Sequence, residues 1–361
     1  MTNAVFRCPH RLSASPHLTT PLAHQDAPGG KTIYWVFPDR SSQQQRVVEQ
    51  AHYWDEYATA AARAGLELGV VSPEAVDVVV AGDRTASVRV CGAPVSPAST
   101  IFVTELYVFP HQVVDTLAQM TTFKTLELAG FYLPIPPDLS LVMNDKAATV
   151  LSFHDSPVPA LPCVRIVSGR DYEDHDLDSL LEGFAFPLAV KPASWGAGVG
   201  FAVARDLNDL RALLGLASGS DCAVVLQPLV AGEVADYRVY FVGGEPHTVL
   251  VRRPQAGDLL ANLNRGARAE FVELPAELEA AAEHAVDAIG LPYFCIDFLF
   301  DGERFWLSEV ELDGGTPWVD RARTQRILYD RFVAYDEAHE LWLASRDEAS
   351  ALSKEVFGVA Q

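Results

Sequence analysis

The chain has 361 residues, and 49% of them are hydrophobic, which is enough for a large core divided over two or three lobes. Its formal net charge is −21, and an acidic surface repels phosphate groups, so we expect neither a nucleic-acid nor a membrane partner. No apolar run reaches the roughly 18 residues that a membrane-spanning helix needs.

Terminal composition and cysteine usage predict a cytoplasmic location. Residues 1–30 are rich in Ser, Pro, Thr and His, without periodicity or an apolar secretion signal, so we interpret them as a mobile tail and 351–361 as a second tail. The cysteines are odd in number, widely spaced and never in a CxxC pair, which predicts free thiols in a reducing compartment. They are Cys8, Cys91, Cys163, Cys222 and Cys295.

A first domain is expected over residues 31–140. Short apolar strands alternate there with helical patterns, which is typical of a parallel sheet covered by helices in an α/β fold. The expected strands are 32–37, 66–72, 76–82, 86–92 and 99–109, and the expected helices are 43–65 and 111–121. This domain looks Rossmann-like, but it contains no GxGxxG motif, so we assign it no dinucleotide.

Two α+β lobes are expected next, over 141–226 and 227–350. In the first lobe, Asn144 and Asp145 predict the start of a helix that contains Lys146. It continues with a strand over 183–192, a turn over 194–200, a helix from Asp206 to a stop at Gly215, and a strand over 222–230. The second lobe contains a hairpin over 236–253, a helix over 275–290, a hairpin that turns at Asp301-Gly302, and a helix over 322–345.

Lys191 and the turn after it predict a phosphate site. Lys191 ends an apolar strand, where burying an ammonium group is unfavourable unless an anion meets it. The following Gly196, Gly198 and Gly200 leave backbone N–H groups free to line a phosphate. The alternative is a lysine that reaches solvent beside an ordinary tight turn. Because the lysine and the turn are adjacent, we favour the phosphate site.

An acidic cluster predicts a magnesium site. Glu309 and Glu311 are two residues apart in a strand and therefore point to one face, and Asp297 lies in the partner strand of the hairpin. The sequence leaves the register of this hairpin open, and with it the face of Asp297. Carboxylates on one face repel each other unless a cation binds, and hard oxygen ligands suit magnesium bound to nucleotide phosphates. The alternative is a solvated strand face, which the flanking aromatic residues disfavour.

A third cluster consists of Asp236-Tyr237-Arg238, Arg252 and the stretch 262–266. Arginine suits bidentate anion binding, and arginines are few in this acidic chain. Taken alone, either arginine is better interpreted as a surface cation.

These motifs, in this order, resemble the ATP-grasp superfamily, and within it the ribosomal-protein glutamate ligases and bacterial glutathione synthetase. The resemblance covers about 141–315 and rests on the succession of motifs. They are Lys146 after Asn-Asp, FPLAVKPASWGAGVGF, QPLV, DYRVYF, NLNRG, and DF followed by EVE. The resemblance implies a Rossmann-like pre-ATP-grasp lobe followed by two sheet lobes that clasp ATP.

The resemblance also implies roles for matching residues. Lys146 and Lys191 would hold the α- and β-phosphates, Gly196 to Gly200 would close over the γ-phosphate, and Gln227, Pro228, Leu229 and Val230 would present backbone groups to adenine. Asp236 would bind ribose, and Arg238, Arg252 and Asn264 would serve catalysis. Asp297, Glu309 and Glu311 would hold two magnesium ions, for which manganese is an acceptable substitute.

The sequence departs from these relatives at several positions. Trp195 stands where the loop usually begins with Gly, and Glu311 stands where Asn is common. Leu260 replaces an arginine and Asn264 replaces a histidine of the ribosomal-protein ligases, so we expect a different acceptor.

The expected function is an ADP-forming ligase that activates a carboxylate as an acyl phosphate and couples it to an amine, on small molecules or a peptide. A homodimer is left open. The alternatives are a phosphotransferase with the same fold and a non-catalytic nucleotide-binding regulatory protein. The carboxylate could lie beyond the carboxyl ends of the first strands, near Asp39, Arg40, Glu105 and Tyr107, although ordinary loop residues are the simpler interpretation of these four.

Overall fold

The structure is a computed structural model, and it describes residues 6–7, 30–38, 53–108, 113–167, 176–196, 198–230, 234–255, 267–316 and 319–357. The chain divides into two compact units. Unit 1 comprises residues 1–107, 118–137 and 321–361, and unit 2 comprises residues 108–117 and 138–320. No helix in the described ranges is both long and apolar enough to cross a membrane.

Unit 1 is built on a parallel four-stranded sheet with the order β1-β3-β2-β7. A parallel sheet was predicted, but the interpretation of residues 1–30 as a tail is wrong at Phe6–Arg7, which pair with β3. Its strands are β1 (Phe6–Arg7), β2 (Lys31–Val36), β3 (Leu66–Val71) and β7 (Thr100–Val103). A separate antiparallel sheet is formed by β4 (Val76–Val80), β5 (Ala86–Val90) and β6 (Ala93–Val95). The last expected strand is shorter than predicted, because β7 ends at Val103 and 104–108 are irregular.

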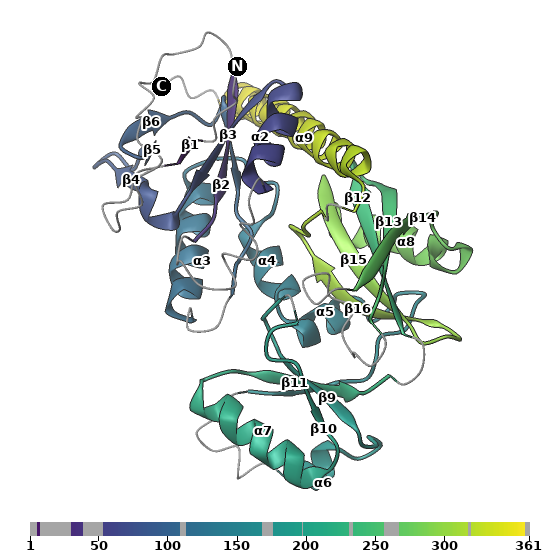
Figure 1. Cartoon of the computed structure of the whole chain (residues 1–361). Helices are drawn as coiled ribbons and strands as arrows, with labels where there is room; N and C mark the ends of the chain where they lie inside the picture. Colours follow the sequence, from purple (N-terminus) through teal and green to yellow (C-terminus); the bar gives the residue numbers. More distant parts are fainter. Residues whose placement is uncertain are drawn as a thin grey trace, which may run out of the picture. The chain divides into compact units, whose positions relative to one another are not determined.

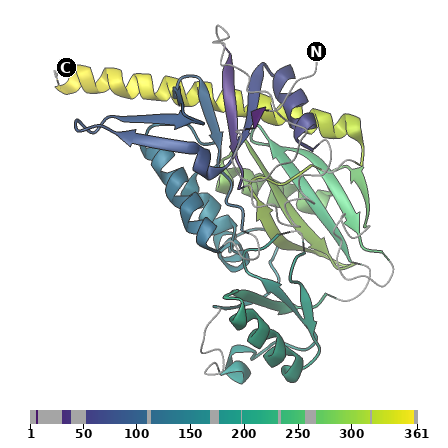
Figure 2. The same ribbon diagram turned by 60° about the vertical axis from the view of Figure 1, so that its left-hand side comes forward.

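Helices cover the parallel sheet of unit 1. Tyr34 and Phe102 pack with Phe123 of α3 (Val113–Leu128), whereas Trp35 contacts Tyr57 of α2 (Tyr53–Arg63) and Phe332 of α9 (Arg321–Phe357). In both views α9, drawn in yellow, lies beside the N-terminal strands and α2 (Figures 1 and 2). The sequence had grouped 322–345 with the last lobe, but the aromatic contacts of α9 place it in unit 1.

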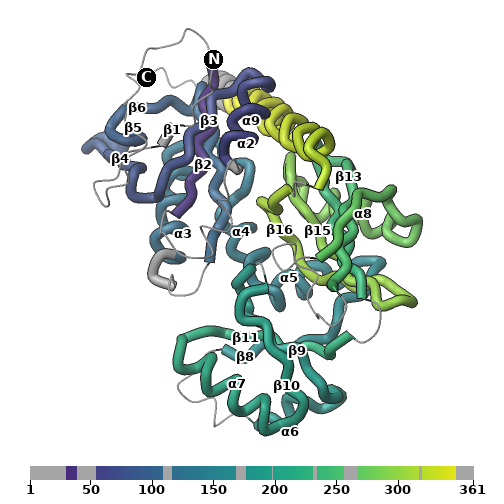
Figure 3. Tube along the Cα trace, viewed as in Figure 1, coloured from purple at the N-terminus to yellow at the C-terminus, as the bar shows by residue number. Residues whose placement is uncertain are grey.

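Unit 2 begins with two short helices, α4 (Pro137–Met143) and α5 (Lys146–Ser152). The first residue of α4, Pro137, still belongs to unit 1. A lid lobe follows, with an antiparallel sheet in the order β10-β9-β11-β8. Figure 3 shows this sheet and its helices as one stretch of the trace, in teal. Its elements are β8 (Val164–Ile166), α6 (Leu177–Leu180), β9 (Leu188–Pro192), β10 (Ala202–Ala204), α7 (Leu207–Gly219) and β11 (Val224–Pro228).

Helix α7 begins at the predicted cap, since the Asp206 side chain accepts the N–H groups of Asn208 and Asp209. The predicted stop at Gly215 is wrong. The helix continues to Gly219 because Leu214 and Ala217 pack into the core of the lid lobe, and this packing outweighs the roughly 1 kcal/mol that an interior glycine costs.

The second lobe of unit 2 is a five-stranded antiparallel sheet with the order β14-β13-β12-β15-β16. Its strands are β12 (Ala235–Val242), β13 (Glu245–Arg253), β14 (Arg268–Val272), β15 (Tyr293–Phe300) and β16 (Phe305–Glu311). Helix α8 (Ala276–Ile289) buries Leu278, Ala281 and Ala285 and ends at Gly290 with φ 63°, a left-handed conformation that favours glycine. Alternation along the strands leaves the opposite face of the sheet to polar residues.

Among the cysteines of the described ranges, Cys163, Cys222 and Cys295 are free, as expected. Cys91 is disulfide-bonded, so the expectation of free thiols is wrong at that position.

Candidate active site

The polar face of the five-stranded sheet gathers residues from four strands. The register pairs Asp236 with Arg252 and Arg238 with Asp297, and it pairs Asp297 with Glu309. The hairpin register that the sequence left open therefore places Asp297 on the same face as Glu309 and Glu311. A bulge follows Asp297, where the strand pairing shifts before Phe298. The sequence could not show this bulge.

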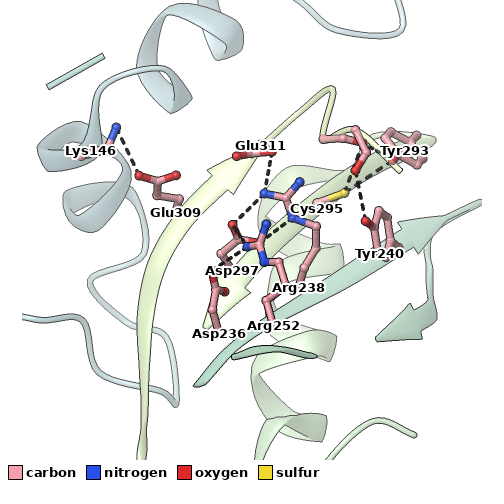
Figure 4. A network of polar contacts seen from close by, with 12 residues as sticks. Lys146, Asp236, Arg238, Tyr240, Arg252, Tyr293, Cys295, Asp297, Glu309 and Glu311 are labelled. Carbon is pink, nitrogen blue, oxygen red and sulfur yellow. Dashed lines mark hydrogen bonds and ion pairs between the residues drawn. The ribbon is translucent and has the colours of Figure 1, made fainter. Parts of the chain in front are cut away.

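Two buried arginines bind the carboxylates of this face (Figure 4). Arg238 donates through Nε and Nη2 to the two oxygens of Asp297, both at 2.7 Å, and Nη2 lies 2.8 Å from Glu311 Oε2. Arg252 Nη2 donates to Asp236 Oδ2 and to Asp297 Oδ2, each at 2.7 Å. Asp297 is only 5% exposed, so a single buried carboxylate holds both guanidinium groups in place.

The two aspartates of this network have opposite electrostatics. Burial alone would raise the pKa of Asp297, but Arg238 and Arg252 lower it to about 2. Burial dominates at Asp236 and raises its pKa to about 7, although Arg252 opposes the shift. Asp236 Oδ1 and Arg252 Nε are buried and have no hydrogen-bond partner among the residues that the structure describes. These two atoms remain able to bind a ligand, because buried polar groups are normally satisfied.

The donor set of this face fits a divalent cation. Carboxylate oxygens of Asp297, Glu309 and Glu311 all lie within 4.8 Å of one another. Three hard oxygen donors at this spacing suit magnesium, which takes few protein ligands and completes its shell with phosphate and water. The structure brings together the three carboxylates that the sequence suggested as metal ligands, and magnesium binding by them stays a prediction.

Lys146 connects the lid lobe to the sheet. The Asp145 side chain caps α5 by accepting the N–H groups of Ala147 and Ala148, which fixes Lys146 in the first turn. Lys146 Nζ donates to the Trp195 carbonyl at 2.8 Å and lies 3.2 Å from Glu309 Oε1. One ammonium group thus contacts both the start of the glycine-rich turn and the acidic strand.

Lys191 lies on the face of the lid sheet that carries α5. Its register partner is Val225, which packs with Ala147 of that helix, whereas its neighbour Val190 packs on the other face. Burial lowers the pKa of Lys191, Glu309 and Asp236 raise it, and Lys146 lowers it further. The two predicted phosphate-binding lysines are therefore close enough for their positive charges to repel each other. An anion bound between them would offset this repulsion.

The positions of the glycine-rich turn differ in how strictly the backbone requires a glycine. Gly198 and Gly200 have φ of 68° and 75°, and a Cβ at Gly200 would lie 2.6 Å from Pro192 Cγ. Glycine is therefore required at Gly200, whereas a Cβ at Gly196 would meet nothing within 4 Å. Trp195, at the start of the turn, packs against the lid core.

Residues 227–230 connect the lid to the sheet. Gln227 and Pro228 end β11, Gln227 is 3% exposed, and the Leu229 N–H donates to the Pro187 carbonyl at 3.2 Å. Val230 follows as the last described residue before a gap.

Several predicted residues are not placed at this site. Asn264, Leu260, Asp39 and Arg40 lie outside the described residues. Glu105 and Tyr107 lie in unit 1, where the Tyr107 hydroxyl accepts the Trp35 indole N–H at 2.9 Å and its backbone exchanges two hydrogen bonds with Gln119. These contacts support the simpler interpretation of Tyr107 as a structural loop residue.

Three buried residues on the polar face were missed in the sequence. Tyr240 lies two residues after Arg238, and Cys295 and Tyr293 lie two and four residues before Asp297. The same alternation that placed Glu309 and Glu311 together could have found them.

Comparison with families of known proteins matches residues 153–327 to a family described as the RimK-like ATP-grasp domain. The chain is 30% identical over 159 residues to a probable alpha-L-glutamate ligase of Thioalkalivibrio sulfidiphilus, a match that covers 43% of this chain and 52% of that protein. The chain thus spans about half the length of the curated relatives it matches.

Solved structures show the same fold. A D-alanine–D-alanine ligase from Bacillus anthracis complexed with ATP superposes with a TM-score of 0.58 at 16% identity, covering 89% of this chain and 100% of that one. The ATP-grasp ligase PsnB, complexed with a phosphomimetic variant of a minimal precursor, Mg and ADP, superposes with a TM-score of 0.56 at 15% identity, covering 84% and 99%. At these identities the likeness establishes the ATP-grasp fold alone.

Proposed function

We propose that this chain, which contains a RimK-like ATP-grasp domain, is an ADP-forming ligase that couples a carboxylate to an amine. The observation that carries the proposal is the meeting of opposite charges from two lobes. Lys146 of the first lobe contacts Glu309 of the sheet, and Glu309 belongs to the three carboxylates that suit a divalent cation. This arrangement matches what phosphoryl transfer requires, namely cations along the phosphates and oxygen ligands for magnesium.

Each residue then has a role in this reaction. Lys146 and Lys191 bind the phosphates, residues 196–200 lie over the transferred group, 227–230 contact the adenine, and Asp236 contacts the ribose. Arg238 and Arg252, oriented by Asp297, bind the transferred phosphoryl group and the acyl phosphate that forms when the substrate carboxylate accepts it. Two magnesium ions, replaceable by manganese, would be held by Asp297, Glu309 and Glu311 and would supply charge neutralisation. Asn264 keeps its proposed catalytic role.

The substrates are proposed as small molecules or a peptide. The named relatives are a glutamate ligase, a D-alanine ligase and a ligase complexed with a precursor. Leu260 and Asn264 stand where the ribosomal-protein ligases carry arginine and histidine, so we expect the acceptor to differ from theirs. We also propose the lobe boundaries near 140 and 226 and a cytoplasmic location, and we leave a homodimer open.

The test is a screen for ADP release over pairs of carboxylates and amines. A productive pair should release ADP and phosphate, and hydroxylamine in place of the amine should trap a hydroxamate that depends on the carboxylate. Pyrophosphate among the products would rule out the acyl-phosphate route. Steady ADP formation without an amine, together with a stable phosphorylated product, would make the protein a phosphotransferase instead.

Glu309→Gln is the matching variant. It removes one charge from the three carboxylates and the partner of Lys146, so ADP release should fall at least about 100-fold while the protein stays folded by circular dichroism. Glu270→Gln, on the exposed edge strand of the same sheet, is the control and should keep activity within twofold. Full activity in Glu309→Gln would refute the assignment.

A further inference from the structure

Beside the arginines, the polar face of the sheet carries a neutral region that is formed by Tyr240, Tyr293 and Cys295. Tyr240 pairs with Cys295 across β12 and β15, and Cys295 pairs with Glu311 across β15 and β16. Tyr293 lies two residues before Cys295 and therefore on the same face. Tyr240, Tyr293 and Cys295 are all 0% exposed, and Figure 4 shows them beside Arg238.

The two tyrosine hydroxyls bind the turn that follows β16. Tyr293 donates to the Gly314 carbonyl at 2.5 Å, and Tyr240 donates to the Gly315 carbonyl at 3.1 Å. Burial raises the pKa of Tyr240, so its phenol stays protonated and remains a donor. Two buried phenols therefore hold two successive carbonyl groups of one turn.

Gly314 lies directly against this neutral region. A Cβ added at Gly314 would lie 2.6 Å from Cys295 Sγ, 2.9 Å from Cys295 Cβ and 3.3 Å from Glu311 Oε2. The backbone can approach Cys295 this closely only because no side chain intervenes. Two adjacent glycines are, however, the most costly residues to order, so the turn needs the tyrosine hydrogen bonds to stay in one conformation.

The orientation of the turn follows from peptide geometry. In a planar trans peptide the C=O and the next N–H point in opposite directions. Because the carbonyls of Gly314 and Gly315 point to the tyrosines, the N–H groups of Gly315 and Thr316 point away from them. Glu311, three residues before Gly314, is the last residue of β16. The conformation of the turn therefore also affects the position of the Glu311 carboxylate at the end of the strand.

We propose that Tyr240 and Tyr293 are positioning residues for the ligase reaction, acting through the Gly314–Gly315 turn on Glu311 and on the two backbone N–H groups. This inference rests on the proposed function, because a fixed turn matters to catalysis only if phosphoryl and acyl transfer occur beside it. Tyr240 and Tyr293 lie on β12 and β15, whereas Lys146 and Lys191 lie on α5 and β9, so we expect nucleotide binding by the lid not to depend on the tyrosines.

The experiment compares Tyr240→Phe and Tyr293→Phe with Tyr237→Phe. Tyr237 is a neighbour on β12 whose ring packs against Phe300 and Phe305 on the other face, so the control removes the same hydroxyl from the same sheet. In the two test variants kcat should fall about tenfold while KM for ATP changes less than twofold, because the turn carries the groups beside the transferred phosphoryl group, whereas Lys146 and Lys191 of the first lobe supply most of the proposed nucleotide binding. Hydrogen exchange of the segment 312–316 should become faster in both, and both kcat and exchange should stay unchanged in Tyr237→Phe.

A tyrosine that only stabilises the fold would lower the melting temperature and leave kcat unchanged, and that result would overturn the inference. A rise in KM for ATP equal to the fall in kcat would overturn it as well. If the unmodified protein forms no ADP with any substrate pair, the proposed function fails separately. Hydrogen exchange then tests only whether the two tyrosines fix the turn. Unchanged exchange in both test variants overturns that part of the inference.

Discussion

Each unit of the molecule contains buried arginine, but the surroundings of the guanidinium groups differ. In unit 1, Arg331 of α9 is 0% exposed, lies 4.5 Å from the Trp35 ring centroid and 5.3 Å from that of Tyr335, and donates from Nε and Nη2 to the Tyr335 hydroxyl. In unit 2, Arg238 and Arg252 are almost as deeply buried, and they bind carboxylates.

The difference separates a structural arginine from a reactive site. The aromatic rings and the phenol that contact Arg331 are fixed by packing, and they carry no formal charge that an incoming cation could share with the arginine. Carboxylates can share their lone pairs between an arginine and an incoming cation, and an arginine can turn from a carboxylate to a phosphate. A buried ion-pair network also gives little net stability, because desolvation offsets the attraction. Its presence on one sheet face therefore argues for function.

The largest expected effect comes from Asp297→Asn. Asp297 accepts from both arginines and belongs to the proposed metal site, so ADP release should fall at least about 1,000-fold. The variant leaves two buried guanidinium groups without their shared charge, which should reduce the free energy of unfolding by about 3 kcal/mol. Activity assays and urea unfolding measure the two quantities. Retained activity would show that the network is as structural as the surroundings of Arg331.

The converse variant is Arg331→Met. The loss of the ring contacts and of two hydrogen bonds should lower the free energy of unfolding by about 2–4 kcal/mol. ADP release per folded molecule should stay within twofold, because Arg331 belongs to unit 1 and the residues proposed for the reaction belong to unit 2. Arg331→Lys, which keeps the charge but not the planar fork, should be destabilised to a similar degree. A loss of turnover at unchanged stability would instead place Arg331 in the reaction.

The difference between the two kinds of arginine also marks what the sequence could show. Asp145 and Asp206 were predictable as caps, and Gly290 as a helix end, because these signals involve residues within one turn of each other. The alternation of Glu309 and Glu311 was equally local. The pairing of Arg238 with Asp297 joins residues 59 positions apart and depends on the register of β12 against β15, which no local signal reveals.

Arg331 of unit 1 shows the same limit of what local sequence signals can predict. Its helical segment was predicted, but its neighbours Trp35 and Tyr57 come from the opposite end of the chain, so nothing local marked it as buried. The motifs that we interpret as phosphate and metal sites could be recognised because their order resembles that of the ATP-grasp superfamily. The tyrosines that hold the turn after β16 had no such order to reveal them.

The smallest expected effect tests a carboxylate outside the network, on the same hairpin. Asp301 Oδ1 accepts the N–H groups of Glu303 and Arg304, both at 2.9 Å, and Oδ2 accepts the Trp306 indole N–H at 2.7 Å. The Arg304 and Trp306 hydrogen bonds lower the pKa of Asp301 to about 2. Asp301→Asn should therefore lower the free energy of unfolding by about 1 kcal/mol at pH 7 and leave ADP release within twofold.

The sign of the pH dependence follows from the lowered pKa. A carboxylate whose pKa is lower in the folded state stabilises the fold above its unfolded pKa of about 3.9, and this contribution is lost as the pH falls towards 2. The difference in unfolding free energy between the unmodified protein and Asp301→Asn should therefore shrink between pH 4 and pH 2, measured by urea unfolding. Glu303→Gln changes the same charge in the same turn without removing an acceptor, and it should show no such trend. Equal trends in the two variants would mean that overall charge, and not the three donors to Asp301, causes the acid sensitivity.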